Sequence, residues 1–224
     1  GVAVPDGRGF IRTLAVAPLV AGLGVLATAC PAPPPPGCTP VTLSAGHVDG
    51  PGIAFEDGAF DIHVHDEETD TEYEPGCVVL QAKDEAETVI PADPAFDFLG
   101  ESGDPVWVLP QVEDPNLLYL GYATEEIEAG TFDGDEVTWS LVDVEGPGSF
   151  ALYSVDQFGA PSVVFDSDDA LPQSIQVPTG DHVHANWAFG AEGTYTLTYQ
   201  VSGTPTGGSP VTSDEVEFTF RVGS

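Results

Sequence analysis

The chain has 224 residues, of which 37 are Asp or Glu and only 4 are Lys or Arg, so its formal net charge is −33. This charge excludes nucleic acid and anionic membrane surfaces as electrostatic partners, and it leaves cations or no charged partner at all. Most of the acids are interpreted as a solvated surface suited to a salty habitat, where salt screens their mutual repulsion. Met is absent, and the two cysteines other than Cys30 are predicted to be oxidised to a disulfide, so a soft Cu(I) site is not expected.

The first 29 residues are predicted to be a secretory signal peptide. Arg8 and Arg12 precede an apolar stretch over 14–29 that is too short and too interrupted by Pro and Gly for a membrane span. The stretch ends in Leu-Ala-Thr-Ala before Cys30, which resembles a bacterial lipobox with Cys30 as the lipid-modified residue. A Pro-rich tether over 30–40 would hold a domain away from the membrane. We expect a lipid-anchored protein on the extracellular face of the cell membrane; an ordinary cleaved signal peptide is the alternative.

The remainder of the chain shows the two-residue periodicity of β-strands and almost no helical periodicity. Val216, Phe218 and Phe220, for example, alternate with polar residues. Turn residues separate such segments at short intervals, as in β-sandwiches. The sequence predicts an all-β, antiparallel sandwich, Ig-like or jelly-roll-like, formed by one domain over 41–224. Expected strands cover 41–48, 52–56, 59–65, 77–82, 106–109, 137–141, 149–155, 161–165, 194–201 and 215–222, with helical turns at 94–99 and 124–129. A further strand is expected to present His182 and His184 and to be anchored by Trp187 and Phe189.

Two cysteines remain if Cys30 carries lipid. Outside the cytosol a disulfide is the default state of such a pair, so Cys38 and Cys77 are predicted to be bonded. The bond would close a loop of about 40 residues, stabilise the fold by about 3–4 kcal/mol and pin the tether to the first sheet.

All five histidines fall in three short segments: His47, the pair His63 and His65, and the pair His182 and His184. Residues i and i+2 of a strand lie on one face, about 6.5–7 Å apart, so two imidazoles at this spacing can converge on one ion. Imidazole ligands favour Zn²⁺, and added carboxylates and water favour Mn²⁺ or Fe²⁺. The nearest acids, which could complete the site or orient an imidazole through its second nitrogen, are Asp49, Asp66, Glu67 and Asp181.

Several motifs together carry a family resemblance. They are Gly46-His47-Val48-Asp49, Val64-His65-Asp66-Glu67, Asp93 to Gly100, Pro105 to Gln111, Gly146 to Phe150, and His182 to Phe189 followed by Gly193-Thr194-Tyr195. Over residues 41–223 the chain resembles the actinobacterial surface-anchored domain called "choice-of-anchor M". Members of that family are secreted, held at the cell surface, and often accompany a metal-uptake ABC transporter. The resemblance therefore implies a transporter's substrate-binding protein as a partner.

The resemblance also weights the histidines unequally. His47, His65, His182 and His184 match the family's recurring positions and are the preferred ligands, with His63 and Asp66 next. Asn186, Asp49 and Asp181 are expected to support them through hydrogen bonds. His47 and His65 are expected to come from a strand layer other than that of His182 and His184.

Other functions remain open at this point. A cupin-type metalloenzyme would also use a His-x-His pair, but the spacings around both pairs differ from cupin motifs. A structural or adhesive surface module would use the histidines only to join strands. The acids around Glu67 to Asp70 lack the spacing of an EF-hand loop, and the chain has no nucleophile elbow or phosphate loop. Trp107, Trp139 and Trp187 are expected in the core. The preferred hypothesis is a non-enzymatic surface lipoprotein that binds a divalent metal, Zn²⁺ before Mn²⁺ or Fe²⁺; haem as cargo is left open.

Overall fold

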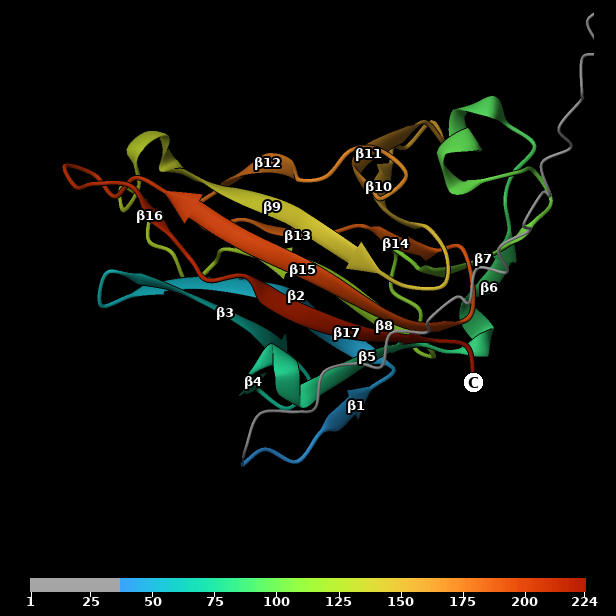
Figure 1. The fold of residues 1–224 in the computed structure, drawn as a ribbon, viewed down its shortest axis with the longest axis horizontal. Helices are drawn as coiled ribbons and strands as arrows, with labels where there is room; N and C mark the ends of the chain where they lie inside the picture. Colours follow the sequence, from blue (N-terminus) through green and yellow to red (C-terminus); the bar gives the residue numbers. More distant parts are fainter. Residues whose placement is uncertain (1–36) are drawn as a thin grey trace, which may run out of the picture.

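The computed structural model describes residues 37–224, and 54% of the structure is strand. The predicted signal peptide (1–29), the predicted lipidation site Cys30 and most of the predicted tether lie outside the described residues. Three sheets pack as one all-β domain, which confirms the predicted sandwich (Figure 1). Two of the three sheets mix parallel and antiparallel pairs. None of the helices in residues 37–224 has the length and apolar character needed to cross a membrane.

The first sheet has seven strands. Its order is β1-β5-β17-β15-β9-β12, with β16 paired to β15, and its two parallel pairs are β1/β5 and β5/β17. The long β15 and β17 keep the predicted alternation, with every second residue buried, because one face covers the core. Its strands are β1 (Val41–Leu43), β5 (Val78–Ala82), β17 (Val216–Val222), β15 (Gly193–Gly203), β9 (Glu136–Glu145), β12 (Gln173–Pro178) and β16 (Val211–Thr212).

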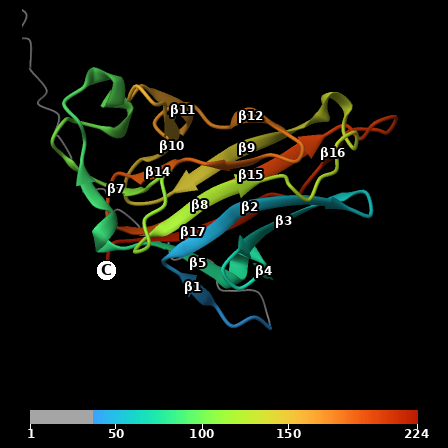
Figure 2. The ribbon, with the colours of Figure 1, turned by 180° about the vertical axis from the view of Figure 1, so that it is seen from behind.

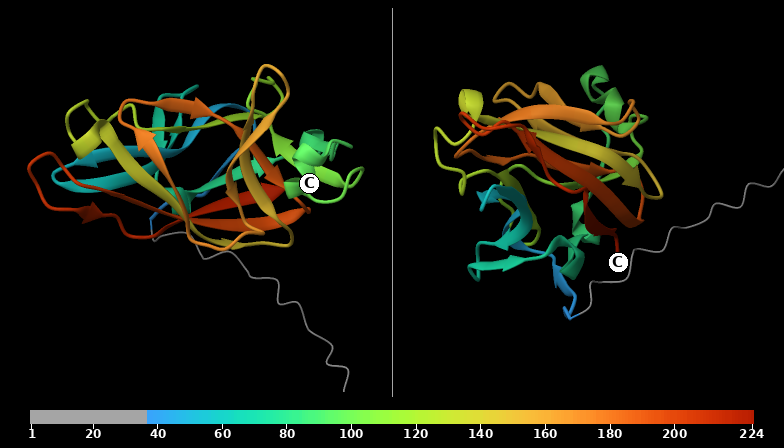
Figure 3. Two further views of the ribbon diagram at one scale, coloured as in Figure 1. Left: turned by 90° about the horizontal axis from the view of Figure 1, so that it is seen from above. Right: turned by 60° about the vertical axis from the view of Figure 1, so that its left-hand side comes forward.

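The second sheet carries all five histidines. Its order is β13-β8-β2-β3-β4, and β2 and β8 run parallel (Figure 2). The cyan strands of this sheet form a layer beside the yellow and orange strands of the first (Figure 3, right). Its strands are β13 (His182–His184), β8 (Leu118–Ala123), β2 (Gly46–Glu56), β3 (Ala59–Asp66) and β4 (Thr71–Tyr73).

The third sheet is antiparallel throughout, in the order β11-β10-β14-β7-β6. Its strands are β11 (Pro161–Asp166), β10 (Phe150–Val155), β14 (Asn186–Phe189), β7 (Pro105–Leu109) and β6 (Glu87–Val89). In the described part of the chain, four short 3₁₀ helices lie in connections between strands of the three sheets: η1 (Pro75–Cys77), η2 (Asp84–Ala86), η3 (Pro94–Leu99) and η4 (Asp133–Asp135).

One apolar core joins the three sheets. Trp139 of the first sheet contacts Tyr122 of the second and Phe165 of the third, with ring centroids 4.8 and 4.9 Å apart. The indole of Trp187 donates a hydrogen bond of 3.1 Å to the Leu120 carbonyl, which ties β14 to β8. All three tryptophans are buried, as predicted. They bury large apolar areas and position the strands that carry the histidines.

The disulfide between Cys38 and Cys77 is formed, as predicted. Cys77 ends η1 immediately before β5, and Cys38 precedes β1, the parallel neighbour of β5. The bond therefore fixes the start of the described chain to the first sheet. A disulfide is consistent with an extracellular or otherwise oxidising location.

The helical turn predicted at 94–99 is present as η3, but the one predicted at 124–129 is wrong. That segment forms hydrogen-bonded turns, in which the Ile127 amide donates to the Thr124 carbonyl. The Thr124 hydroxyl donates to the Pro178 carbonyl at 2.6 Å and holds the segment against the entry to β13. Five strands were not expected from the sequence: β4, β6, β8, β12 and β16.

Candidate metal site

The register of the second sheet places the histidines on one face in transverse rows. One row runs from His184 through Gly121 and Asp49 to His65. The next row runs from His182 through Ala123 and Gly52 to His63. The side chains of such a row point to the same side of the sheet, and those on adjacent strands are close enough to contact one another.

A β-bulge in β2 makes these two rows possible. Asp49 and Gly52 are three residues apart and would point to opposite faces of a regular strand. The register of β2 shifts between them against both neighbours, so one extra residue is accommodated. A bulge of this kind re-aims side chains, and here it returns Gly52 to the face that carries Asp49.

Two glycines leave the space that the histidine and aspartate side chains fill. A Cβ on Gly121 would lie 2.6 Å from Asp49 Oδ1, 3.1 Å from His184 Cε1 and 3.2 Å from His182 Nε2. A Cβ on Gly52 would lie 2.6 Å from His63 Nε2. These distances are shorter than van der Waals contact, so the convergence of polar side chains depends on glycine at both positions.

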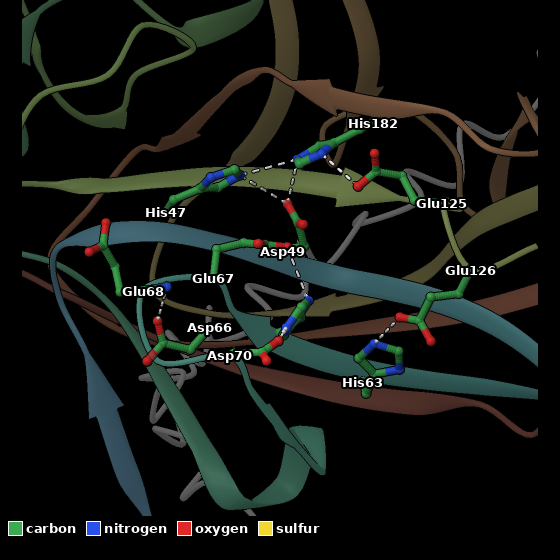
Figure 4. Close-up of polar contacts among 11 residues, drawn as sticks. His47, Asp49, His63, Asp66, Glu67, Glu68, Asp70, Glu125, Glu126 and His182 are labelled. Atoms are coloured by element: carbon green, nitrogen blue, oxygen red, sulfur yellow. Dashed lines mark hydrogen bonds and ion pairs between the residues drawn. The ribbon is translucent and has the colours of Figure 1, made fainter.

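His47, Asp49, His182 and His184 form the first of three groups that could hold a metal ion. His47 Nε2 lies 3.2 Å from His182 Nε2, and Asp49 Oδ1 lies 2.8 Å from His182 Nε2 and 3.7 Å from His47 Nε2 (Figure 4). Tetrahedral Zn²⁺ with bonds of about 2.0–2.1 Å would separate its ligand atoms by about 3.3–3.4 Å. The three distances bracket that value, and three imidazoles with one carboxylate are a donor set that Zn²⁺ accepts.

Asp49 is the most unusual member of this group because its side chain is only 1% exposed. Burial raises the pKa of its carboxyl group, and the charges of His182 and His47 act in the opposite direction. A buried carboxylate requires a cation or hydrogen-bond donors to remain ionised. Within residues 37–224, every ion pair closer than 4.0 Å involves a histidine and none involves Lys or Arg. The imidazoles, or an ion held with them, are therefore the cationic partners within reach.

His184 is held differently from the other two imidazoles. Its ring stacks on Tyr119 with centroids 3.5 Å apart and planes inclined by 5°. Burial, together with the neighbouring His47 and His182, lowers the pKa of His184 to about 4. Its imidazole is therefore neutral near pH 7, the form that binds a metal ion.

Glu125 supports the group from the turn after β8. Its Oε2 lies 2.9 Å from His182 Nδ1, while the opposite ring nitrogen faces Asp49. A carboxylate on the second nitrogen fixes the tautomer and orientation of a metal-binding imidazole and increases its basicity.

His65 and His63 belong to two further groups, Asp49–His65–Glu67 and His63–Glu72–Glu126. His65 Nδ1 lies 3.1 Å from Glu67 Oε1, and His63 Nε2 lies 3.1 Å from Glu126 Oε1. The two histidines belong to different groups, so the structure does not bring them to one ion as in a cupin pair.

The structure brings together three of the four preferred histidines, His47, His182 and His184, and places His65 on the other side of Asp49. The expectation that they come from two strand layers is wrong, because β2, β3 and β13 belong to one sheet.

Asp66 and Asp181 lie outside all three groups in the described part of the chain. Asp66 pairs with Val48 in register, one residue from His65, so alternation points it to the other face. Its carboxylate accepts hydrogen bonds from the Glu68 amide and the Thr69 hydroxyl. The Asp181 carbonyl accepts a hydrogen bond from the Thr124 amide, which positions β13 through the main chain.

Asn186 does not continue the histidine face, because the chain passes from the second sheet to the third at Ala185. Its amide group bonds both the main chain and the side chain of Gln111. The supporting role expected for Asn186 and Asp181 does not fit these positions. Sequence reasoning missed Glu72, Tyr119, Gly121, Glu125 and Glu126, since only β-sheet register brings them to the histidines.

Comparisons of the chain with protein-family models, with curated proteins and with solved structures gave no match. The chemistry of the site is therefore argued from its own geometry.

Proposed function

We propose that this protein is a cell-surface lipoprotein that binds a divalent transition metal, Zn²⁺ in preference to Mn²⁺ or Fe²⁺, through His47, Asp49, His182 and His184. The observation that carries the proposal is the Asp49 carboxylate, buried beneath three imidazoles with no Lys or Arg paired to it. A Zn²⁺ ion would neutralise that carboxylate and use the imidazoles in their neutral form. Equilibrium binding, without catalysis, is the activity proposed.

The place of this activity in the cell is a proposal that extends the sequence resemblance. We propose membership of the choice-of-anchor M family, lipid attachment at Cys30, and capture of metal for a metal-uptake ABC transporter through its substrate-binding protein. The disulfide between Cys38 and Cys77 supports an extracellular setting. The net charge of −33 supports the capture of cations, since it raises their concentration near the surface.

Calorimetric titration of the metal-free protein with Zn²⁺ and Mn²⁺ tests the proposal. We expect a Zn²⁺ Kd below about 10 µM. Disturbing a group behind a ligand costs about 10–100-fold in metal affinity, so loss of a ligand in His182→Gln should cost more than about 100-fold. Glu217→Gln, on the seven-stranded sheet, is the matched control and should bind as the native protein does. Binding weaker than about 10 µM, or unchanged in His182→Gln, would contradict the proposal.

A structural role is the second candidate, and the stacking of His184 on Tyr119 favours it. In that case the histidines join strands, and Zn²⁺ has no site. Thermal unfolding separates the two roles, because a ligand that binds only the folded state raises the unfolding temperature. Stabilisation by Zn²⁺ that disappears in His182→Gln would favour metal binding. A lower unfolding temperature in His182→Gln, with no response to Zn²⁺ in either protein, would favour the structural role.

A further inference from the structure

A cavity of about 180 Å³ opens beside Asp49. It is lined by two histidines and five carboxylates, and by no Lys or Arg. One of the two lining histidines, His63, has a buried ring whose two nitrogens face the carboxylates of Asp61 and Glu126. The polar lining consists of Asp49, His63, His65, Glu67, Glu72, Glu125 and Glu126.

Asp49 belongs to two of the three candidate groups. On one side it meets His47, His182 and His184, and on the other it meets His65 and Glu67. Its register explains this double membership, because Asp49 pairs with Gly121 on β8 and with His65 on β3. A carboxylate has two oxygen atoms, so it can bind one ion on each side.

We propose that Asp49 bridges two metal ions, and that His65 and Glu67 hold the second. This inference rests on the proposed binding of the first ion. The first position has three imidazoles and one carboxylate, which complete a tetrahedral set without His65 or Glu67. The second has one imidazole and two carboxylates, an oxygen-rich set that suits Mn²⁺ or Fe²⁺ as well as Zn²⁺. Metal ions in two-metal protein sites lie about 3.5–4 Å apart.

The charge of the cavity supports a second ion. Its five carboxylates are Asp49, Glu67, Glu72, Glu125 and Glu126. One divalent ion would leave three of their negative charges uncompensated, and a second ion would leave one. Because Asp49 is 1% exposed, water screens its repulsion from Glu67 poorly, so a cation between the two carboxylates relieves it.

The His63 group is a separate feature. It contains Glu72 and Glu126 but not Asp49, so an ion there would have no bridging ligand to the first position. This difference allows the two arrangements to be told apart by variants of His65 and His63.

The experiment loads the metal-free protein with Mn²⁺, measures bound metal by mass spectrometry, and records the electron paramagnetic resonance spectrum. We expect two ions per chain and an exchange-coupled spectrum, whose hyperfine lines are more closely spaced than those of isolated Mn²⁺. His65→Gln and Glu67→Gln should each retain one ion with an uncoupled spectrum. Glu217→Gln should retain two coupled ions, and metal-free unfolding curves of all variants verify that they fold.

The other outcomes separate this inference from the proposed function. One ion in the native protein, lost in His182→Gln and kept in His65→Gln, overturns the bridged pair and leaves the first site standing. Two uncoupled ions, with the second lost in His63→Gln and kept in His65→Gln, overturn the bridge and place the second ion at the His63 group. No bound Mn²⁺ overturns the bridged pair, and the proposed function is overturned as well only if the calorimetric titration with Zn²⁺ also shows no binding.

Discussion

The two faces of the second sheet differ in chemistry although the same strands form both. The inner face presents buried apolar residues such as Val48, Val64, Leu118 and Leu120 to the core. The outer face presents histidines and carboxylates from alternating positions of those strands. Packing of the inner face determines where the strands lie, and this placement brings the polar groups of the outer face together. Stability and metal chemistry should therefore respond to different substitutions.

The largest expected effect on stability comes from the inner face. Leu118→Ala removes a fully buried side chain of β8, so we expect the free energy of unfolding to fall by about 2–5 kcal/mol. Chemical denaturation of the metal-free protein measures this loss. The Zn²⁺ affinity of the folded protein should change only a few-fold, and its abolition would show that the two faces are not separable.

Removal of the disulfide, which lies outside the second sheet, also tests whether stability and metal binding are independent. Replacing Cys38 and Cys77 by Ser should lower the free energy of unfolding by about 3–4 kcal/mol, because the denatured chain regains the freedom of a long loop. The bond joins residues that precede β1 and β5 of the first sheet, so Zn²⁺ titration of the variant should give the affinity of the native protein. A large loss of affinity would indicate that the first sheet shapes the site.

On the outer face, Gly121→Ala tests the site most specifically among substitutions that leave every proposed ligand in place. The added methyl group would press on Asp49, His182 and His184. We expect Zn²⁺ affinity to fall by about 10–100-fold, the range for changes that disturb the orientation of ligands. Calorimetry measures the affinity, and unfolding of the metal-free protein is the control. Unchanged affinity would mean that the ion does not lie between these three side chains.

The smallest expected effect is a pH dependence of metal-free stability due to His184. Its pKa is about 4 in the folded protein and near 6.5 when unfolded, so the unfolded chain binds a proton first as pH falls. The stability contributed by neutral His184 is present above about pH 6.5 and is lost as pH falls towards about 4. The groups facing its ring are His47, His182, Asp49 and Tyr119.

His184→Phe keeps a ring against Tyr119 and removes the titrating group. Between about pH 7 and pH 5, its unfolding temperature should fall by a few °C less than that of the native protein. Equal pH dependences in the two proteins would show that the His184 ring is not held in its neutral form.

The sequence predicts the all-β sandwich well because alternation in β15 and β17 is a direct record of one buried face. It predicts the disulfide because two cysteines in an oxidising setting have one partner each. It does not predict β8, whose residues Leu118–Ala123 are nearly all apolar or Gly and show no alternation. Without β8, neither Gly121 nor the neighbouring Glu125 can be placed.

The histidine positions were found by spacing, but their grouping was not. Grouping depends on register and on the bulge between Asp49 and Gly52, which are long-range properties of the sheet. Asp49 was therefore placed among the supporting residues, as one of several acids that could complete the site, whereas its buried position puts it at the centre of the site. Asp66 was expected to be a ligand because it is adjacent to His65 in sequence, although adjacent residues of a strand face opposite sides.

X-ray absorption at the zinc edge of the Zn²⁺-loaded protein tests the site most directly. At one equivalent of Zn²⁺ we predict a first shell of four nitrogen and oxygen atoms at about 2.0–2.1 Å, with the outer scattering of three imidazoles. His182→Gln should reduce the imidazole contribution to two rings or release the ion. A shell of oxygen atoms without imidazole scattering would contradict a site formed by His47, Asp49, His182 and His184.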